Sequence, residues 1–125
     1  MSDFLRSRLR SFGFAFSGLR YVLKTQKNAW IHFVISLAVI LLGIWLGISA
    51  PSWAIIFLTM GLVWTAECLN TAVESILDLV SPQHNPIAKI GKDVAAAAVL
   101  VSAISAVMVG ICIFGPSLLT ILFHR

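Results

Sequence analysis

The sequence predicts an all-α integral membrane protein, with an N-terminal amphipathic surface helix followed by three transmembrane helices. Its 125 residues are 59% apolar and only 11% charged, with a mean hydropathy of +0.97, whereas soluble domains carry about 25% charged residues. Three apolar stretches reach the roughly 20 residues that a bilayer crossing needs. We therefore treat residues 1–125 as one membrane domain. Three spans enclose little core, so we expect a homo-oligomer.

Residues 3–26 form the predicted surface helix. Their apolar side chains fall within an arc of about 140° on a helical projection, and basic side chains occupy the opposite side. The apolar set is Phe4, Leu5, Leu9, Phe12, Phe16, Leu19 and Leu23, and the basic set is Arg6, Arg10, Arg20 and Lys24. This pattern is typical of a helix that lies on a membrane surface. Basic residues there can also hold phosphates.

The three predicted spans are residues 30–48, 53–80 and, after an interfacial turn that starts at residue 87, the stretch up to residue 114. Pro51 is predicted to end the first helix. The second stretch is longer than a crossing needs, so its last three turns should lie near or beyond the membrane boundary. A proline-rich break at 81–86 follows. The third span is rich in small residues, which suit close helix packing, and Gly115-Pro116 is predicted to end it.

Charge placement predicts the topology. Most Lys and Arg residues lie in the first 27 positions or at Lys89 and Lys92, and the turn at residues 47–52 carries no charge. The positive-inside rule then puts the N-terminus and the second loop in the cytoplasm, within a bacterial inner membrane that the chain crosses several times. Basic clusters beside a span favour anionic lipid headgroups, so we expect no nucleic-acid partner.

An acidic stripe is the most informative motif. Glu67, Asn70, Glu74 and Asp78 are spaced i, i+3, i+7 and i+11, which places them within about 80° of one helix face. A carboxylate at membrane depth is costly unless it is paired, hydrated or metal-bound. The stripe therefore indicates a site for a metal and a polyanion. A plainer alternative stays open, above all for Asp78: a solvated helix end that pairs with Arg20, Lys24 and Lys92.

Phosphoryl transfer fits these residue types, because it needs phosphate neutralisation, a metal and a group that orients the nucleophile. The three carboxylates of the stripe are candidates for metal ligation and for a base, and Asn70 for a phosphate or metal contact. Lys92 is a candidate for neutralising phosphate charge, with Asp93 orienting it or binding a base or ribose. Oxygen-rich donors favour Mg²⁺. The sequence has no P-loop, no G-x-G-x-x-G and no H-E-x-x-H motif.

Two histidines receive weaker interpretations. His32 lies near the start of the first span and is interpreted as an interfacial or packing residue. His84 lies in the loop beside the acidic stripe, where a nucleotide contact and a simple loop role are both open.

The segments ECLNTAVE at 67–74 and AKIGKD at 88–93, with Asp78 between them, resemble the prokaryotic diacylglycerol kinase family. The likeness is closer to its undecaprenol kinase branch, which is common in Gram-positive bacteria. The segments SGLR at 17–20 and TQKNAWIH at 25–32 also fit that branch. The resemblance extends over nearly the whole chain.

That resemblance implies a homotrimer whose active sites lie between subunits at the cytoplasmic boundary and use Mg²⁺ to move the γ-phosphate of ATP to a lipid hydroxyl. It implies that Glu67 is the catalytic base and Glu74 a metal ligand. It implies nucleotide or phosphate roles for Asn70, Asp78, Lys92 and Asp93. Arg10 falls near a basic residue of the family's surface helix, a less direct match, and receives the same role. Gln26 stands where many members carry a second metal-binding Glu, so a weaker or altered Mg²⁺ dependence is expected.

Several functions compete at this point. The leading hypothesis is phosphorylation of undecaprenol, and the alternative acceptor is diacylglycerol, which would yield phosphatidate. A small ion-coupled transporter or channel subunit would use Glu67 as an ion or proton relay, but it has no evident need for the Lys92–Asp93 pair. A membrane scaffold would leave the acidic stripe without a role.

Overall fold

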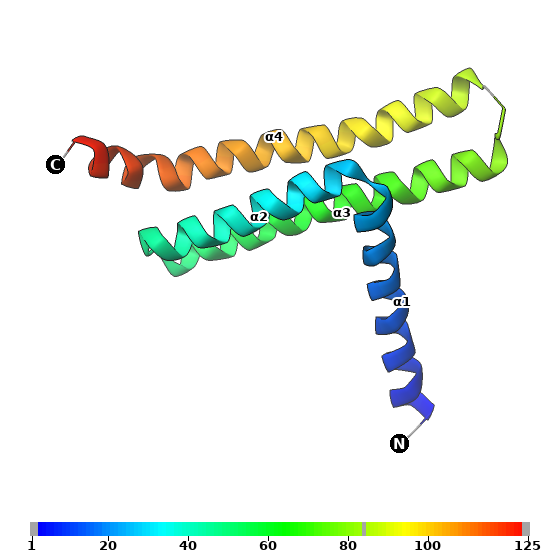
Figure 1. The fold of residues 1–125 in the computed structure, drawn as a ribbon, viewed down its shortest axis with the longest axis horizontal. Coiled ribbons are helices and arrows are strands. Elements are labelled where there is room, and N and C mark those ends of the chain that lie inside the picture. Colours follow the sequence, from blue (N-terminus) through cyan, green and yellow to red (C-terminus); the bar gives the residue numbers. More distant parts are fainter. Residues whose placement is uncertain (1–2, 84, 124–125) are drawn as a thin grey trace.

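The computed structural model describes residues 3–83 and 85–123, which form four helices. These are α1 (Asp3–Thr25), α2 (Lys27–Leu46), α3 (Ala50–Val80) and α4 (Pro86–Phe123). In Figure 1, α2, α3 and α4 lie side by side, and α1 projects crosswise from the start of α2. These last three helices are each long and apolar enough to cross a membrane. The all-α class is confirmed, and the described ranges contain no strand.

Gln26 forms the elbow between α1 and α2. It is the only residue between the two helices, and its backbone is extended, with φ −102° and ψ 115°. Its N–H still donates to the Val22 carbonyl at 2.9 Å, while Val22 and Ala29 are buried on either side. The chain therefore turns sharply at one position, and α3 and α4 continue past the level of this turn (Figure 1).

The turn between α2 and α3 differs from the expected one. The helix stops after Leu46 because Gly47 adopts the left-handed conformation at φ +61°, which costs glycine little and other residues more. The N–H groups of Gly47 and Ile48 then bond to the carbonyls of Ile44 and Gly43. Pro51 does not end α2, since it lies in the first turn of α3, where its missing N–H is not needed.

The last helix is longer than the sequence predicted. Asn85 precedes it, and its Oδ1 accepts from the N–H groups of Ile87 at 2.9 Å and Ala88 at 3.5 Å, so the predicted interfacial turn is already helical. Gly115-Pro116 does not end the helix, which continues to Phe123. Pro116 removes a single backbone donor, whereas unwinding would leave several backbone groups unpaired in an apolar region.

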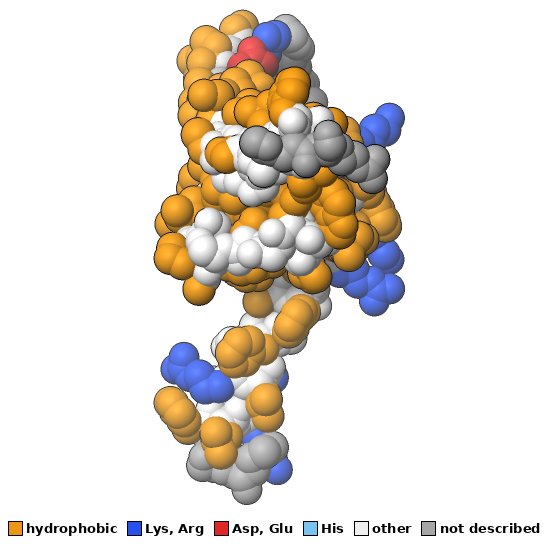
Figure 2. All heavy atoms as spheres, turned by 90° about the vertical axis from the view of Figure 1, so that its left-hand side faces the viewer, with side chains coloured by type: hydrophobic (Ala, Val, Ile, Leu, Met, Phe, Trp, Pro, Cys, Tyr) orange, Lys and Arg blue, Asp and Glu red, His pale blue; other side chains and the backbone are white. Residues whose placement is uncertain are grey.

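The bundle exposes most of its apolar side chains. Only a few hydrophobic residues are buried, among them Ile56, Val63 and Val99, while many large ones along α2, α3 and α4 are more than half exposed. Figure 2 looks onto the end that carries the α2–α3 turn and shows mainly hydrophobic side chains over the three helices, with Lys and Arg side chains at their margins and on α1. Such a surface is suited to lipid or to other subunits.

Replacing Gly47 with Ala should destabilise the protein by about 1 kcal/mol, because a Cβ is disfavoured at a left-handed position. Gly13→Ala is the matched control: it lies within α1, with open space around its Cα, and should be neutral or slightly stabilising. Unfolding in mixed micelles measures both. Equal effects of the two substitutions would contradict the assigned turn.

Candidate active site

Glu67 is the most deeply buried large side chain in the described structure, at 1% exposed. Neither carboxylate oxygen has a hydrogen-bond partner among residues 3–83 and 85–123. Nε2 of His32, from α2, lies 3.8 Å from Oε2. That distance exceeds a hydrogen bond, and Nε2 is itself buried with no hydrogen-bond partner in the described part of the chain. Burying a carboxylate without a hydrogen-bond partner is costly. A ligand, a cation or another subunit would therefore be the natural partner of Glu67.

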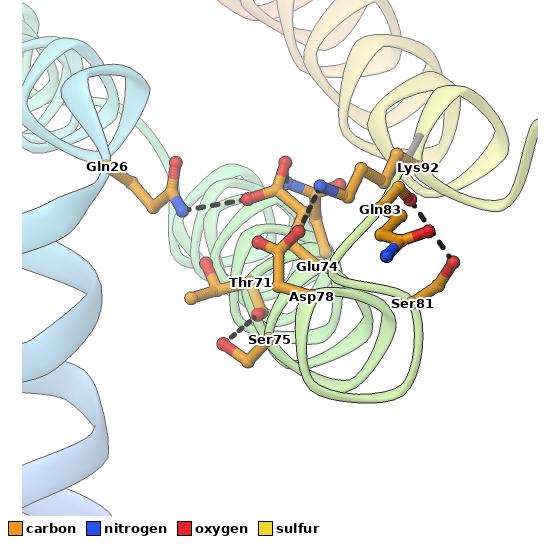
Figure 3. A network of polar contacts seen from close by, with 9 residues as sticks. Gln26, Thr71, Glu74, Ser75, Asp78, Ser81, Gln83 and Lys92 are labelled. Atoms are coloured by element: carbon orange, nitrogen blue, oxygen red, sulfur yellow. Dashed lines mark hydrogen bonds and ion pairs between the residues drawn. The ribbon is translucent and has the colours of Figure 1, made fainter. Parts of the chain in front are cut away.

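Glu74 lies two turns further along α3 and is held by two amides. Gln26 Nε2 donates to its Oε2 at 3.0 Å, and Asn70 Nδ2 donates to its Oε1 at 3.2 Å. Figure 3 shows Gln26 reaching Glu74 from the elbow between α1 and α2. The Asn70 Oδ1 is buried and has no hydrogen-bond partner in the described ranges. The fold thus brings Gln26, Asn70 and Glu74 together, although Gln26 is 48 positions from Glu74.

These three side chains fit a hard divalent cation. Each amide carries an oxygen beside its nitrogen, and which of the two faces a neighbour is assigned from the surroundings. With a cation on Glu74, both amides would turn their oxygens inward and give an oxygen-only set. Within the described residues no cluster of three or more His, Cys, Asp or Glu side chains is present that would hold a metal. Mg²⁺ suits a sparse site, because it keeps several waters and needs few protein ligands.

Asp78 and Lys92 lie at the outer end of the stripe. Lys92 Nζ donates to Asp78 Oδ1 at 2.5 Å and so joins α4 to α3 (Figure 3). Both side chains are partly exposed. The plainer interpretation of Asp78, a solvated helix end paired with Lys92, therefore agrees with the structure, and the same contact places an ammonium next to the stripe.

The remaining predicted site residues are less well gathered. Asp93 pairs with Lys89 at 2.6 Å, one turn earlier in α4, rather than orienting Lys92. Arg10 is exposed on α1, and no ion pair joins it to the stripe within the described parts of the chain. His84 lies outside the described residues.

Sequence reasoning missed the position of His32. It was interpreted as an interfacial or packing residue, yet its imidazole faces Glu67 across the α2–α3 contact. Spacing along one helix carries no information about such a contact between helices. The only available signal was that His32 is the sole titratable side chain inside the first predicted span.

Comparison with known proteins identifies the family of this chain. A sequence profile of the prokaryotic diacylglycerol kinase family matches residues 13–114. A diacylglycerol kinase of Synechocystis sp. is 44% identical over 115 residues, which is 91% of this chain but 66% of that protein, slightly less than two thirds. An undecaprenol kinase of Bacillus subtilis is 38% identical over 109 residues, 87% of this chain and 89% of that protein. A diacylglycerol kinase of Escherichia coli K12 is 26% identical over 100 residues.

A helical membrane protein with this site, and with relatives named for lipid phosphorylation, falls in the class of lipid kinases. Within that class, the chain belongs to the prokaryotic diacylglycerol kinase family. The resemblance noted from residues 67–74 and 88–93 is thereby confirmed, and ATP is the co-substrate that a kinase family implies.

The Asp78–Lys92 contact should contribute a coupling free energy of about 0.2–1 kcal/mol, the usual size for exposed ion pairs. A double-mutant cycle with Asp78→Asn and Lys92→Gln, read out as the free energy of unfolding in detergent at low salt, measures it. The coupling should shrink in 1 M salt because of screening. Zero coupling at low salt would contradict the contact between α3 and α4.

Proposed function

We propose that this protein transfers the γ-phosphate of ATP to the hydroxyl of undecaprenol, giving undecaprenyl phosphate and ADP, with Glu67 as the general base. The observation that carries the proposal is the buried Glu67 carboxylate, which has no partner within the described chain and lies two turns from the amide-held Glu74. A lipid alcohol enters from the bilayer and reaches membrane depth, where a soluble substrate would not.

The proposed phosphoryl transfer needs one proton acceptor from the protein, and Glu67 fills that role. Glu67 accepts the hydroxyl proton as the acceptor oxygen forms its bond to the γ-phosphorus of ATP. The bond from that phosphorus to the β–γ bridging oxygen breaks, and ADP departs with the electron pair. The carboxylate oxygens of Glu67 are free to accept that proton, because no described side chain already donates to them.

Glu74, Gln26 and Asn70 would hold Mg²⁺, which when bound neutralises phosphate charge and orients the transferring group. Glu74 supplies the one full negative charge of this set, and the two amides supply oxygens. Without the cation, the hydrogen bonds from Gln26 and Asn70 keep the three side chains together, and a turn of each amide would replace these bonds with oxygen ligands.

Lys92 supplies the positive charge for the ATP phosphates, and its partly exposed ion pair with Asp78 leaves it accessible. Asn70, Asp78 and Asp93 complete the nucleotide contacts, with Glu74 reaching ATP through the metal. Arg10 and His84 are also proposed to contact the nucleotide. Because α1 carries Arg10 away from its own bundle (Figure 1), Arg10 would act at the site of a neighbouring subunit in a homotrimer.

The proposal places the nucleotide side in the cytoplasm. α1 and the ends of α3 and α4 that carry Asp78 and Lys92 lie toward the same end of the bundle (Figure 1), and the basic residues gather there. The positive-inside rule assigns such an end to the cytoplasmic face.

The acceptor is proposed on the motif likeness to the undecaprenol kinase branch and on the Bacillus subtilis relative, which aligns over 89% of its own length. Diacylglycerol is the second candidate, favoured by the name of the Synechocystis relative. Both lipids offer a primary hydroxyl at the headgroup level. Parallel phosphorylation of undecaprenol and diacylglycerol by the purified protein tests the choice, and a higher kcat/KM for diacylglycerol would overturn it.

Glu67→Gln should lower kcat by at least about 100-fold, because it removes the proton acceptor and leaves the shape of the side chain nearly intact. The KM for ATP should stay within about twofold, since Glu67 lies away from the Lys92 end. Steady-state release of ADP in the presence of undecaprenol measures both values. Near-normal turnover would remove Glu67 from the role of base.

Gln26→Glu should shift the midpoint of the Mg²⁺ titration to lower concentration by roughly tenfold, because it adds a negative charge to the ligand set. Gln83→Glu is the matched control, since it adds the same charge in the loop after α3 without contacting Glu74. An unchanged midpoint in Gln26→Glu, or an equal shift in both variants, would count against a metal role for Gln26.

A further inference from the structure

His32 belongs to two features of the fold at once. Its Nε2 faces the Glu67 carboxylate at 3.8 Å, and its side chain also lines a cavity of about 510 Å³ between α2, α3 and α4. The cavity continues past His32 along residues such as Val39, Ile56, Ala106 and Phe114. His32 therefore lies between the Glu67 carboxylate and an apolar space that Glu67 itself does not line.

The polar groups that line the cavity are satisfied, with one exception. Ser36 Oγ accepts from Trp64 Nε1 at 3.3 Å, and Thr59 Oγ1 donates to the Ile55 carbonyl at 2.7 Å. The exception is His32 Nε2, which is buried and has no hydrogen-bond partner among the described residues. An occupant that matches this lining is hydrocarbon along its length and carries one polar group at the His32 end.

The distance between His32 and Glu67 is too long for a direct hydrogen bond and short enough to be bridged by one hydroxyl oxygen. Direct N···O hydrogen bonds measure about 2.7–3.2 Å, so 3.8 Å is too long for a bond between the two side chains. A hydroxyl oxygen about 2.8 Å from each atom would bridge them, and because both atoms are closed to solvent in this structure, the imidazole would have to turn or shift to admit it. The hydroxyl would donate its proton to Oε2 of Glu67 and accept a hydrogen bond from the His32 Nε2–H.

We propose that His32 binds the acceptor hydroxyl and sets it against Glu67, with the hydrocarbon chain of the lipid alcohol lying in the α2–α3–α4 cavity. This inference rests on the proposed function and adds a subsite to it. From Ile31 to Leu42 the α2 wall of the cavity is about 16 Å long, so it holds the part of a long chain that adjoins the hydroxyl. His32 contributes alignment of the nucleophile, while Glu67 takes the proton.

The first test is kinetic. His32→Leu should raise the KM for undecaprenol and lower kcat/KM about tenfold, the size expected for one lost hydrogen bond, with the KM for ATP unchanged. His32→Gln, which keeps a donor, should recover part of the loss. If His32→Leu matches the wild type, or if the loss falls on the KM for ATP, the proposal is overturned.

The second test concerns the cavity. Ala106→Leu should raise the KM for undecaprenol about tenfold and should affect the short-chain alcohol farnesol less. Ala97→Leu, on an exposed face of the same helix, is the control and should change neither KM. A loss of subunit assembly in Ala106→Leu with an unchanged lipid KM would show that a second copy of the chain fills the space, and would overturn the lipid assignment.

Photolabelling of the wild-type protein tests the subsite without relying on variants that could misfold. A polyprenol carrying a diazirine near its hydroxyl end should label residues of α2 and α4 that line the cavity, and excess undecaprenol should suppress the labelling. Labelling confined to the outer apolar faces would overturn the subsite. Failure of the wild type to phosphorylate any lipid alcohol is a different result, because it removes the proposed function itself.

Discussion

The buried carboxylate of Glu67 is the constraint on which the rest of this structure depends. A carboxyl group without a partner among apolar helices opposes folding, and α3 places one there at 1% exposure without a donor from the described chain. Such a cost agrees with the proposed role of Glu67 as a general base. Around Glu67 lie a histidine across the helix contact, an apolar cavity that this histidine lines, and polar residues spaced along one face toward the end of the bundle.

The acidic stripe on α3 extends from the apolar part of the bundle to its more polar end. Glu67 lies where the helices are apolar, Glu74 lies at the level of the elbow between α1 and α2, and Asp78 meets Lys92 where α3 and α4 extend past that elbow (Figures 1 and 3). A phosphoryl transfer between a nucleotide and a lipid requires this arrangement, because one substrate is soluble in water and the other in the bilayer. In the proposed function α3 carries the carboxylates for both substrates, while Gln26 comes from the elbow, His32 from α2 and Lys92 from α4.

Much of this was predictable from periodicity, and the remainder depended on contacts between helices. The apolar runs predicted three spans, and the 3.6-residue repeat placed Glu67, Asn70, Glu74 and Asp78 on one face. The turn at residues 47–52 was expected, but the end of the first helix was assigned to Pro51 and not to Gly47, because a proline fits the first turn of a helix as well as the end of one. The contacts of His32 with Glu67 and of Gln26 with Glu74 join separate helices, and no local pattern encodes them. The pairing of Asp93 with Lys89 depended on α4 starting at Pro86, before the expected span.

The most direct test is an experimental structure of the assembled protein with undecaprenol, Mg²⁺ and a non-hydrolysable ATP analogue. The account predicts that the lipid hydroxyl lies within hydrogen-bond distance of Glu67, with the cation on Glu74 and the γ-phosphate between them. A lipid hydroxyl bound elsewhere, or Glu67 directed into hydrocarbon while the nucleotide occupies a distant surface, would contradict it.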